Sequence, residues 1–213
     1  MGALILNIHS ETPELRKIRK VVDELRNGAV ILYPTDTGFS LGCELSNKEA
    51  IAKIRHIRNI SLNKELTFLC DSLSNIAEFA KVEDIAYKVM NALIPGPYTF
   101  ILPASKKVPT FAQNPKRKTA GIRVPDSVLA QLLLKELGQP IVSISAKHEK
   151  LNEFSTPDEI IDVFKHQVDI AVSSDSYDFQ GVSTVIDMTG EQFMIVREGA
   201  GFEKVEEIIE VKE

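Results

Sequence analysis

Residues 33–37, Tyr-Pro-Thr-Asp-Thr, bring two threonine hydroxyls and a carboxylate together directly after the apolar run 29–32. Short apolar runs bounded by Gly and Pro are typical of buried strands, so this stretch predicts a strand, a tight polar turn and a second strand from Gly38. Pro34 fixes its own φ and keeps the residue before it extended. The turn suits a binding corner, although a plain turn in which Asp36 caps nearby amides is an equally good interpretation.

Further hydroxyls and cations fall near the ends of strand-like runs, and we expect the set to converge on one site. Its members are Thr35, Thr37, Arg58, Lys64, Thr119, Arg123, Ser143, Ser145, Ser183, Thr184 and Arg197. Such a site binds anions without a strong general base, which suits phosphoryl or nucleotidyl transfer, because that chemistry depends on positioning and charge neutralisation. The sequence has no zinc-ligand spacing, Walker-type loop or GxGxxG loop, and its four histidines form no ligand or triad pattern. We therefore assign no metal-ligating residue.

The composition predicts a single α/β domain over residues 1–213, since 44% of the residues are hydrophobic and the chain shows no repeat or linker. A net charge of −5 does not suit a protein coated for nucleic acid. Cations nevertheless gather in two segments without acids, 50–64 and 85–125. The RNA-binding candidates among them are Lys106, Lys107, Lys116, Arg117 and Lys118. A module that recognises double-stranded RNA or tRNA by shape is therefore the alternative function.

Cys43 and Cys70 each adjoin an apolar run, which favours two buried thiols over a disulfide or a metal pair. Residues 3–6 are apolar but too few for a signal peptide or a membrane span. We expect a cytoplasmic protein that does not bind a membrane. The oligomeric state cannot be read from the sequence.

Strand and helix patterns alternate along the chain. Predicted strands cover residues 3–8, 66–70, 100–102, 119–124, 141–145, 170–172, 183–186 and 193–196, besides the two at the corner. Helices are predicted to begin at Thr12, at a capping box opened by Ser46, at Asp126 and at Ser155-Thr156-Pro157. Because the late strands follow one another as hairpins, we expect an open, mixed sheet.

Five motifs in order make the chain resemble the YrdC family, most closely its YciO branch. They are Tyr33-Pro34-Thr35-Asp36-Thr37 with Leu41-Gly42, Pro95-Gly96-Pro97-Tyr98-Thr99, Arg123-Val124-Pro125, Ser183-Thr184-Val185-Ile186-Asp187 and Arg197-Glu198-Gly199. They span about residues 28–201. The resemblance implies an open twisted α/β fold with a basic concave surface.

Enzymes of this family make threonylcarbamoyl-AMP from threonine, bicarbonate and ATP for a tRNA modification. The resemblance implies threonine-site positions at Thr37, Arg123, Ser143 and Ser183, and ATP-site positions at Thr119, Ser145, Ser155 and Arg197. It also implies that the carboxylate of N-carboxythreonine attacks the α-phosphorus, with Mg²⁺ on the phosphates.

Two departures from the synthase pattern predict weak or altered activity. Arg58-Asn59-Ile60 stands where synthases carry Lys-x-Arg, and Ser145-Ala146-Lys147 stands where they carry Ser-x-Asn. Ile60 removes a charge-assisted phosphate contact, so we expect Arg58, Lys64 and Lys147 to hold the nucleotide. If the strand continues past Ser145, Lys147 points to the same face and replaces the lost cation; a solvated loop is the alternative. Catalytic roles are accordingly expected for Arg58, Lys147 and Arg197.

Overall fold

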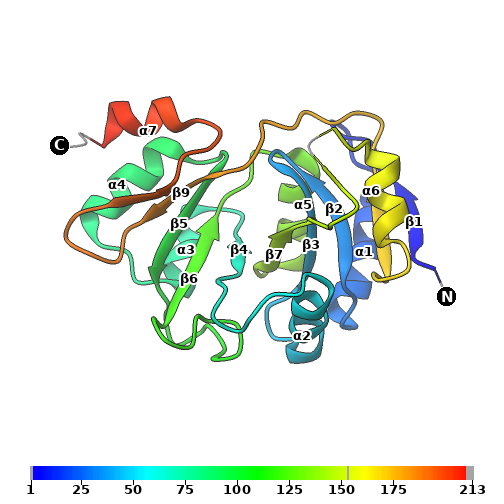
Figure 1. The fold of residues 1–213 in the computed structure, drawn as a ribbon, viewed down its shortest axis with the longest axis horizontal. Helices are drawn as coiled ribbons and strands as arrows, with labels where there is room; N and C mark the ends of the chain where they lie inside the picture. The colour runs from blue at the N-terminus through cyan, green and yellow to red at the C-terminus, as the bar shows by residue number, and fades with distance from the viewer. Residues whose placement is uncertain (1, 153, 210–213) are drawn as a thin grey trace.

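The computed structural model describes residues 2–152 and 154–209, in which one ten-stranded sheet runs through the molecule (Figure 1). The strands are β1 (Leu4–Asn7), β2 (Ile31–Thr35), β3 (Gly38–Glu44), β4 (Thr67–Leu69), β5 (Tyr98–Pro103), β6 (Thr119–Arg123), β7 (Ile141–Ser145), β8 (Ile170–Ser173), β9 (Thr184–Asp187) and β10 (Met194–Arg197). Their order across the sheet is β1-β8-β2-β3-β7-β4-β6-β5-β9-β10. The sheet contains both parallel and antiparallel pairs, which confirms the mixed sheet.

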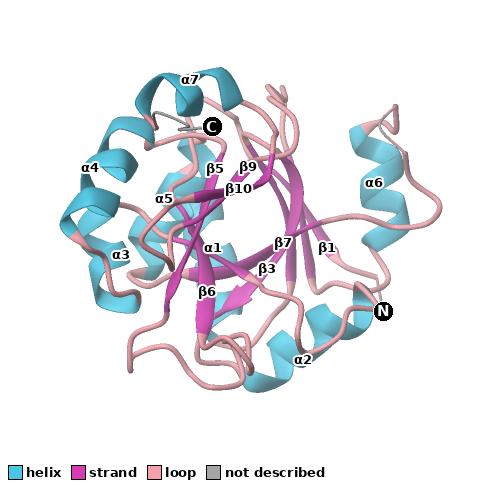
Figure 2. Ribbon diagram, turned by 60° about the vertical axis from the view of Figure 1, so that its left-hand side comes forward, coloured by secondary structure: helices cyan, strands magenta, loops and turns pink. Residues whose placement is uncertain are grey.

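Seven helices in the described residues cover the sheet, with α3, α4 and α7 grouped at one end of the molecule and α6 at the other (Figure 2). They are α1 (Leu15–Arg26), α2 (Lys48–Ile57), α3 (Leu73–Phe79), α4 (Asp84–Leu93), α5 (Val128–Leu137), α6 (Pro157–Phe164) and α7 (Phe202–Ile208). The sequence did not predict α7. None of these helices is long and apolar enough to cross a bilayer.

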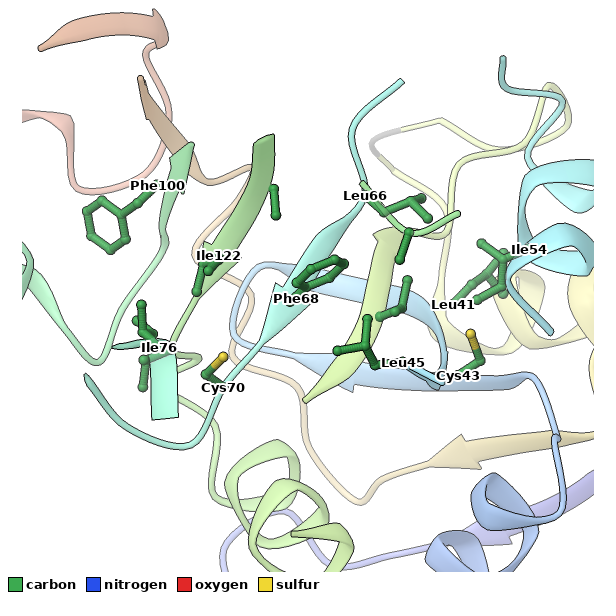
Figure 3. Close-up of a cluster of buried hydrophobic side chains, with 14 of the residues drawn as sticks. Leu41, Cys43, Leu45, Ile54, Leu66, Phe68, Cys70, Ile76, Phe100 and Ile122 are labelled. Carbon is green, nitrogen blue, oxygen red and sulfur yellow. The ribbon is translucent and has the colours of Figure 1, made fainter. Parts of the chain in front are cut away.

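Alternation along the strands divides the core between the two faces of the sheet. On one face, Leu41 and Cys43 of β3 and Phe68 of β4 pack towards α2 and α3 (Figure 3). On the other face, Ile31 and Tyr33 of β2 pack against α1 and α5. This second face is open beyond the two helices, and the polar residues of the central strands lie there.

Three helix starts lie one or two residues later than predicted. The structure places the N-caps at Glu14, Asn47 and Ser127 rather than at Thr12, Ser46 and Asp126. Before α1, the His9 imidazole accepts hydrogen bonds from the backbone N–H groups of Glu11 and Thr12, so a separate turn precedes the helix. The other two shifts arise because Asn47 and Ser127 accept from the amides three residues ahead, which the predicted caps leave free.

Other local predictions are confirmed. Thr156 caps α6 in a capping box with Glu159, and Pro157 is at the start of the helix. Cys43 and Cys70 are both buried free thiols. Burial raises the pKa of both thiols well above their ordinary value, so neither is poised to react.

Candidate functional site

A cavity of about 340 Å³ lies over the central strands on the open face of the sheet. Alternate residues of neighbouring strands form its floor. In register, Gly42 pairs with Ser143 and Ser143 with Thr67, while Thr67 pairs with Gly121 and Gly121 with Ile101. Because side chains on one face recur every second residue, Ser40, Ser145, Leu69, Arg123 and Thr99 face the same cavity. The expectation that Ser143 and Ser145 share a face is confirmed.

Arg123, at the end of β6, is the most deeply buried cation of the cavity, with 5% of its surface exposed. Its guanidinium donates to the Asp36 carboxylate, to the Thr37 hydroxyl and to the Gly96 carbonyl, the last at 3.2 Å. Burial lowers the pKa of Arg123 and the Asp36 charge opposes this, so the group stays protonated. The turn at residues 35–38 therefore holds Arg123 against the sheet.

Arg197 reaches the same cavity from β10. Its Nε donates to the Ser183 carbonyl at 2.8 Å, and its Nη2 donates to the Ser183 hydroxyl at 2.9 Å. That hydroxyl is also 2.9 Å from the Thr99 hydroxyl. Burial and then the charge of Arg123 lower the pKa of Arg197. Two guanidinium groups that repel each other across a cavity attract an anion between them.

Tyr33 holds Ser143 from below. Its buried hydroxyl donates to the Ser143 hydroxyl at 3.0 Å, and burial raises the pKa of Tyr33 well above its ordinary value. The phenol is therefore neutral and serves as a donor. It leaves the Ser143 hydroxyl proton free to point into the cavity.

Lys64 and Glu65 line the cavity at the opposite end of its floor from Arg123. Buried Arg55 of α2 positions this loop by donating to the carbonyls of Ser61 at 2.8 Å and Lys64 at 3.0 Å. Glu65 accepts from the hydroxyl of Thr119 at 2.5 Å. Thr119 is buried in the wall rather than among the lining residues.

Several predicted site residues do not line the cavity. Arg58 donates to the backbone carbonyl of Lys147 at 2.5 Å and so ties α2 to the segment after β7. The premise that the strand continues through Lys147 is wrong, because β7 ends at Ser145 and the Lys147 amide turns back to the Ser145 carbonyl. Ser155 lies in a separate hollow before α6. Whether these residues reach a ligand stays a prediction.

Thr35 and Thr184 have structural partners instead. Thr35 donates to the Gly38 carbonyl at 2.9 Å, and Thr184 donates to the Ala200 carbonyl at 3.0 Å. Both hydroxyls stabilise the turns that carry cavity residues.

The RNA-binding candidates are exposed, but two of the five are paired with acids. Arg117 forms an ion pair with Asp187 at 2.6 Å, and Lys107 forms one with Glu78 at 2.6 Å. Lys106, Lys116 and Lys118 are exposed on the same connection between β5 and β6. Pairing reduces the charge that this surface can offer to a phosphate backbone.

The structure adds four cavity residues that the sequence did not single out as ligands: Ser40, Glu65, Thr67 and Thr99. It also adds Tyr33, which supports the cavity residue Ser143 by a hydrogen bond. Thr99 and Tyr33 belong to motifs, so their signal was present. Glu65 had a weaker signal, as the acid that ends a basic segment.

The arrangement can bind an anion and orient it, and the one carboxylate among the described residues that line it, Glu65, already accepts a hydrogen bond from Thr119. Its lining contains three cations, Lys64, Arg123 and Arg197, and a ring of hydroxyls. Within the described residues, no three His, Cys, Asp or Glu side chains gather in a way that could hold a metal ion. Chemistry at this site therefore depends on charge neutralisation and alignment.

Residues 23–199 match the family model Sua5/YciO/YrdC, described as "Telomere recombination". Over 196 residues, 91% of this chain and 94% of the relative, the chain is 42% identical to a Haemophilus influenzae protein. Over the same shares it is 40% identical to YciO of Escherichia coli. The threonylcarbamoyl-AMP synthase of Vibrio vulnificus is 27% identical over 180 residues, 83% of this chain and 96% of the synthase.

Solved structures agree with the sequence relatives. The crystal structure of E. coli YciO matches with a TM-score of 0.89 at 38% identity, over 95% of this chain and 98% of YciO. P. abyssi Sua5 complexed with L-threonine matches with a TM-score of 0.88 at 25% identity, over 97% of this chain and 61% of Sua5. With its motifs gathered around one cavity of this fold, the chain belongs to the Sua5/YciO/YrdC family.

Proposed function

We propose that the cavity binds an adenine nucleotide together with threonine, and that the chain has weak or altered threonylcarbamoyl-AMP synthase activity. The observation that carries this proposal is the pair of guanidinium groups in one cavity lining, Arg123 bound to the Thr37 hydroxyl and Arg197 bound to the Ser183 hydroxyl. The threonylcarbamoyl-AMP synthases among its relatives, and the threonine complex of Sua5, support the choice of ligands.

In this proposal each residue acts by position and charge. Arg123, already fixed by Asp36, binds the threonine carboxylate, and Ser143 and Ser183 donate hydrogen bonds to the amino acid. Arg197 neutralises negative charge that builds on the phosphates as the carboxylate of N-carboxythreonine attacks and pyrophosphate leaves. Mg²⁺ arrives with the phosphates as part of the nucleotide substrate.

Two features of the chain support weak rather than efficient activity. Ile60 packs against the apolar core and offers no donor, where the synthases carry an arginine. Arg58, the cation beside it, uses its guanidinium to hold the Lys147 carbonyl. Fewer cationic donors are therefore free to bind the triphosphate on this side of the cavity.

Pyrophosphate release from ATP tests the proposal. We expect slow release that requires both threonine and bicarbonate and that disappears in Arg197→Ala. The matched control is Arg19→Ala, since exposed Arg19 lies on α1 and pairs only with half-buried Glu136 among the described residues. Release that persists without threonine, or no release at high enzyme concentration, would show that the chain is not a threonylcarbamoyl-AMP synthase.

Calorimetry with ATP, AMP and threonine in turn separates binding from catalysis. If wild type binds threonine and Arg123→Ala does not, the proposed threonine site is supported even when no turnover is detected. No binding of any of the three ligands would remove the whole proposal.

A further inference from the structure

A second pocket, of about 250 Å³, adjoins the turn between β2 and β3. The turn separates it from the cavity of the two arginines, because Thr37 lines the cavity whereas Thr35 and Asp36 line the second pocket. The rest of its wall comes from the start of α5, from the segment before α1 and from the segment after β8. No described residue lines both pockets, so the second is a site of its own.

The charged side chains that line this pocket are all acidic. Among the described residues they are Glu11, Asp36, Asp126 and Asp178, and no Lys, Arg or His is among the lining residues. Asp36 pairs with Arg123, but the other three form no ion pair with a described residue. The N-terminus of α5 adds roughly half a unit of positive charge. Because these positive charges offset only part of the four carboxylates, we call the site the acidic pocket.

Asp36 contributes a buried oxygen that has no partner. Its Oδ1 accepts from Arg123, whereas its Oδ2 has no hydrogen-bond partner among the described residues, although only 2% of the side chain is exposed. Asp36 lines the acidic pocket and Arg123 does not, so the oxygen that Arg123 leaves free belongs to the acidic pocket. A buried carboxylate oxygen without a donor costs free energy, and a positive charge in the pocket would recover part of that cost.

Aromatic rings form another part of the wall. Tyr177 and Phe179 both line the pocket, and their ring centroids are 5.4 Å apart. Each ring also packs against Phe39, which fixes the pair against the core. An aromatic face attracts a cation and also accepts methylene groups. Carboxylates and aromatic surface together suit an organic cation.

The four carboxylates come from four separate segments of the chain. Within the part of the chain that the structure describes, no three acidic, His or Cys side chains lie close enough together to hold one metal ion. Carboxylates that cannot converge on one ion instead suit a ligand that carries several charges along its length.

We propose that the acidic pocket binds a linear polyamine, with its ammonium groups among the carboxylates and its methylene segments against Tyr177 and Phe179. One ammonium group offsets the charge of Asp36, and the others lie near Asp126 and Asp178. The proposal is independent of the proposed function, because it uses no residue that lines the cavity of the two arginines.

The competing explanation is that the acidic pocket is only a negative surface that attracts any cation weakly. Such a surface would respond to the net charge of the protein, wherever a charge is removed. A built site responds to the removal of its own carboxylates and distinguishes a polyamine from a metal ion.

Calorimetric titration of spermidine into the full chain, at physiological ionic strength, tests the proposal. We expect one saturable site in wild type, weakened about fivefold in Asp126→Asn and in Asp178→Asn. Asp23→Asn is the matched control, because exposed Asp23 of α1 lies outside the pocket, and it should stay within about twofold of wild type. Phe179→Leu keeps the apolar surface and should weaken binding about threefold through loss of the ring face. Thermal melts confirm that each variant folds.

Three results would overturn the inference. They are no saturable binding of spermidine, affinities in Asp126→Asn and Asp178→Asn that stay within about twofold of wild type, and an equal loss in Asp23→Asn. Titration of Mg²⁺ alone supplies a further check. Mg²⁺ that binds as tightly as spermidine and is weakened by the same two substitutions would show a general cation surface rather than a polyamine site.

Discussion

Asp36 and Arg123 form an ion pair beneath the cavity, with only 2% and 6% of their side chains exposed. Asp36 comes from the turn between β2 and β3, and Arg123 from the end of β6, so the pair joins two strands that are not neighbours in the sheet. One Asp36 oxygen has no hydrogen-bond partner among the described residues. The other Asp36 oxygen accepts from Arg123, so the guanidinium is the partner on which this buried carboxylate depends.

Removing Asp36 should destabilise the fold strongly. Asp36→Ala leaves a buried guanidinium without its counterion, which costs about 3 to 5 kcal/mol in the free energy of unfolding. Urea denaturation measures this change. Asp162→Ala is the control, since its pair with Lys165 is on the surface and contributes below about 1 kcal/mol. If both variants lose the same free energy of unfolding, the buried ion pair contributes no more to stability than the surface pair does.

Tyr33→Phe should lower the free energy of unfolding at neutral pH. It should also make this free energy fall less steeply at alkaline pH. The variant loses the hydrogen bond to Ser143, about 1 kcal/mol. Because burial raises the pKa of Tyr33 above its unfolded value near 10, the neutral phenol stabilises the fold below that pH. This stabilisation is lost as pH rises towards the folded pKa.

Urea midpoints between neutral and alkaline pH check the Tyr33 prediction. Wild type should lose stability above about pH 10 more steeply than Tyr33→Phe. Tyr87→Phe, which changes an exposed ring, should follow wild type. Parallel curves for all three proteins would show that Tyr33 does not titrate with unfolding.

Much of the fold follows from periodicity and from local turn chemistry. The hairpin at residues 31–44 and the two serines of β7 were predicted because alternation and Gly-Pro boundaries are local signals. Strand order was not predictable, because β8 inserts between β1 and β2 through contacts distant in sequence. Figure 1 shows the long orange connection that follows β8 and crosses to β9.

For the site, the sequence identified several cavity residues on strands or beside strand ends, but it misplaced Lys147 beyond the end of β7. Thr37, Arg123, Ser143, Ser183 and Arg197 do meet in one cavity. Lys147 does not line it, because the chain turns after Ala146, where the Lys147 amide donates to the Ser145 carbonyl. Glu65 was missed because its position depends on the register between β4 and β6, which no local pattern specifies.

The pair between Asp187 and Arg117 should make stability depend on pH in the acid range. Burial alone would raise the pKa of Asp187, but hydrogen bonds from Thr189 and Arg117 outweigh burial and hold it below 3.8. A depressed pKa stabilises the fold above the unfolded pKa, and this contribution is lost as pH falls through the folded pKa. At neutral pH, Asp187→Asn should cost about 1 to 3 kcal/mol.

Urea midpoints measured from neutral pH downwards check this sign. The gap between wild type and Asp187→Asn should be constant at neutral pH and should close below about pH 4. Asp162→Asn, on the surface of α6, should show a small gap throughout. A gap that widens in acid would mean that the sign is wrong.

Gly199 should tolerate no side chain, although it is two residues beyond the cavity cation Arg197. A Cβ there would collide with the carbonyl oxygen of Val182 and come within 2.7 Å of the Ser183 backbone. Since backbone cannot yield as a flexible side chain can, Gly199→Ala must separate two segments that the Gly199 amide joins to Thr184 at 3.0 Å. We expect a loss of about 1 to 3 kcal/mol in the free energy of unfolding.

The same displacement should weaken anion binding, because Arg197 is held by both the carbonyl and the hydroxyl of Ser183. Calorimetry with pyrophosphate, beside urea denaturation, measures the two effects together. Gly190→Ala is the control, since its nearest atom is 3.6 Å from the added carbon and it should change stability by less than about 0.5 kcal/mol. Full anion affinity in a destabilised Gly199→Ala would show that Ser183 does not position Arg197.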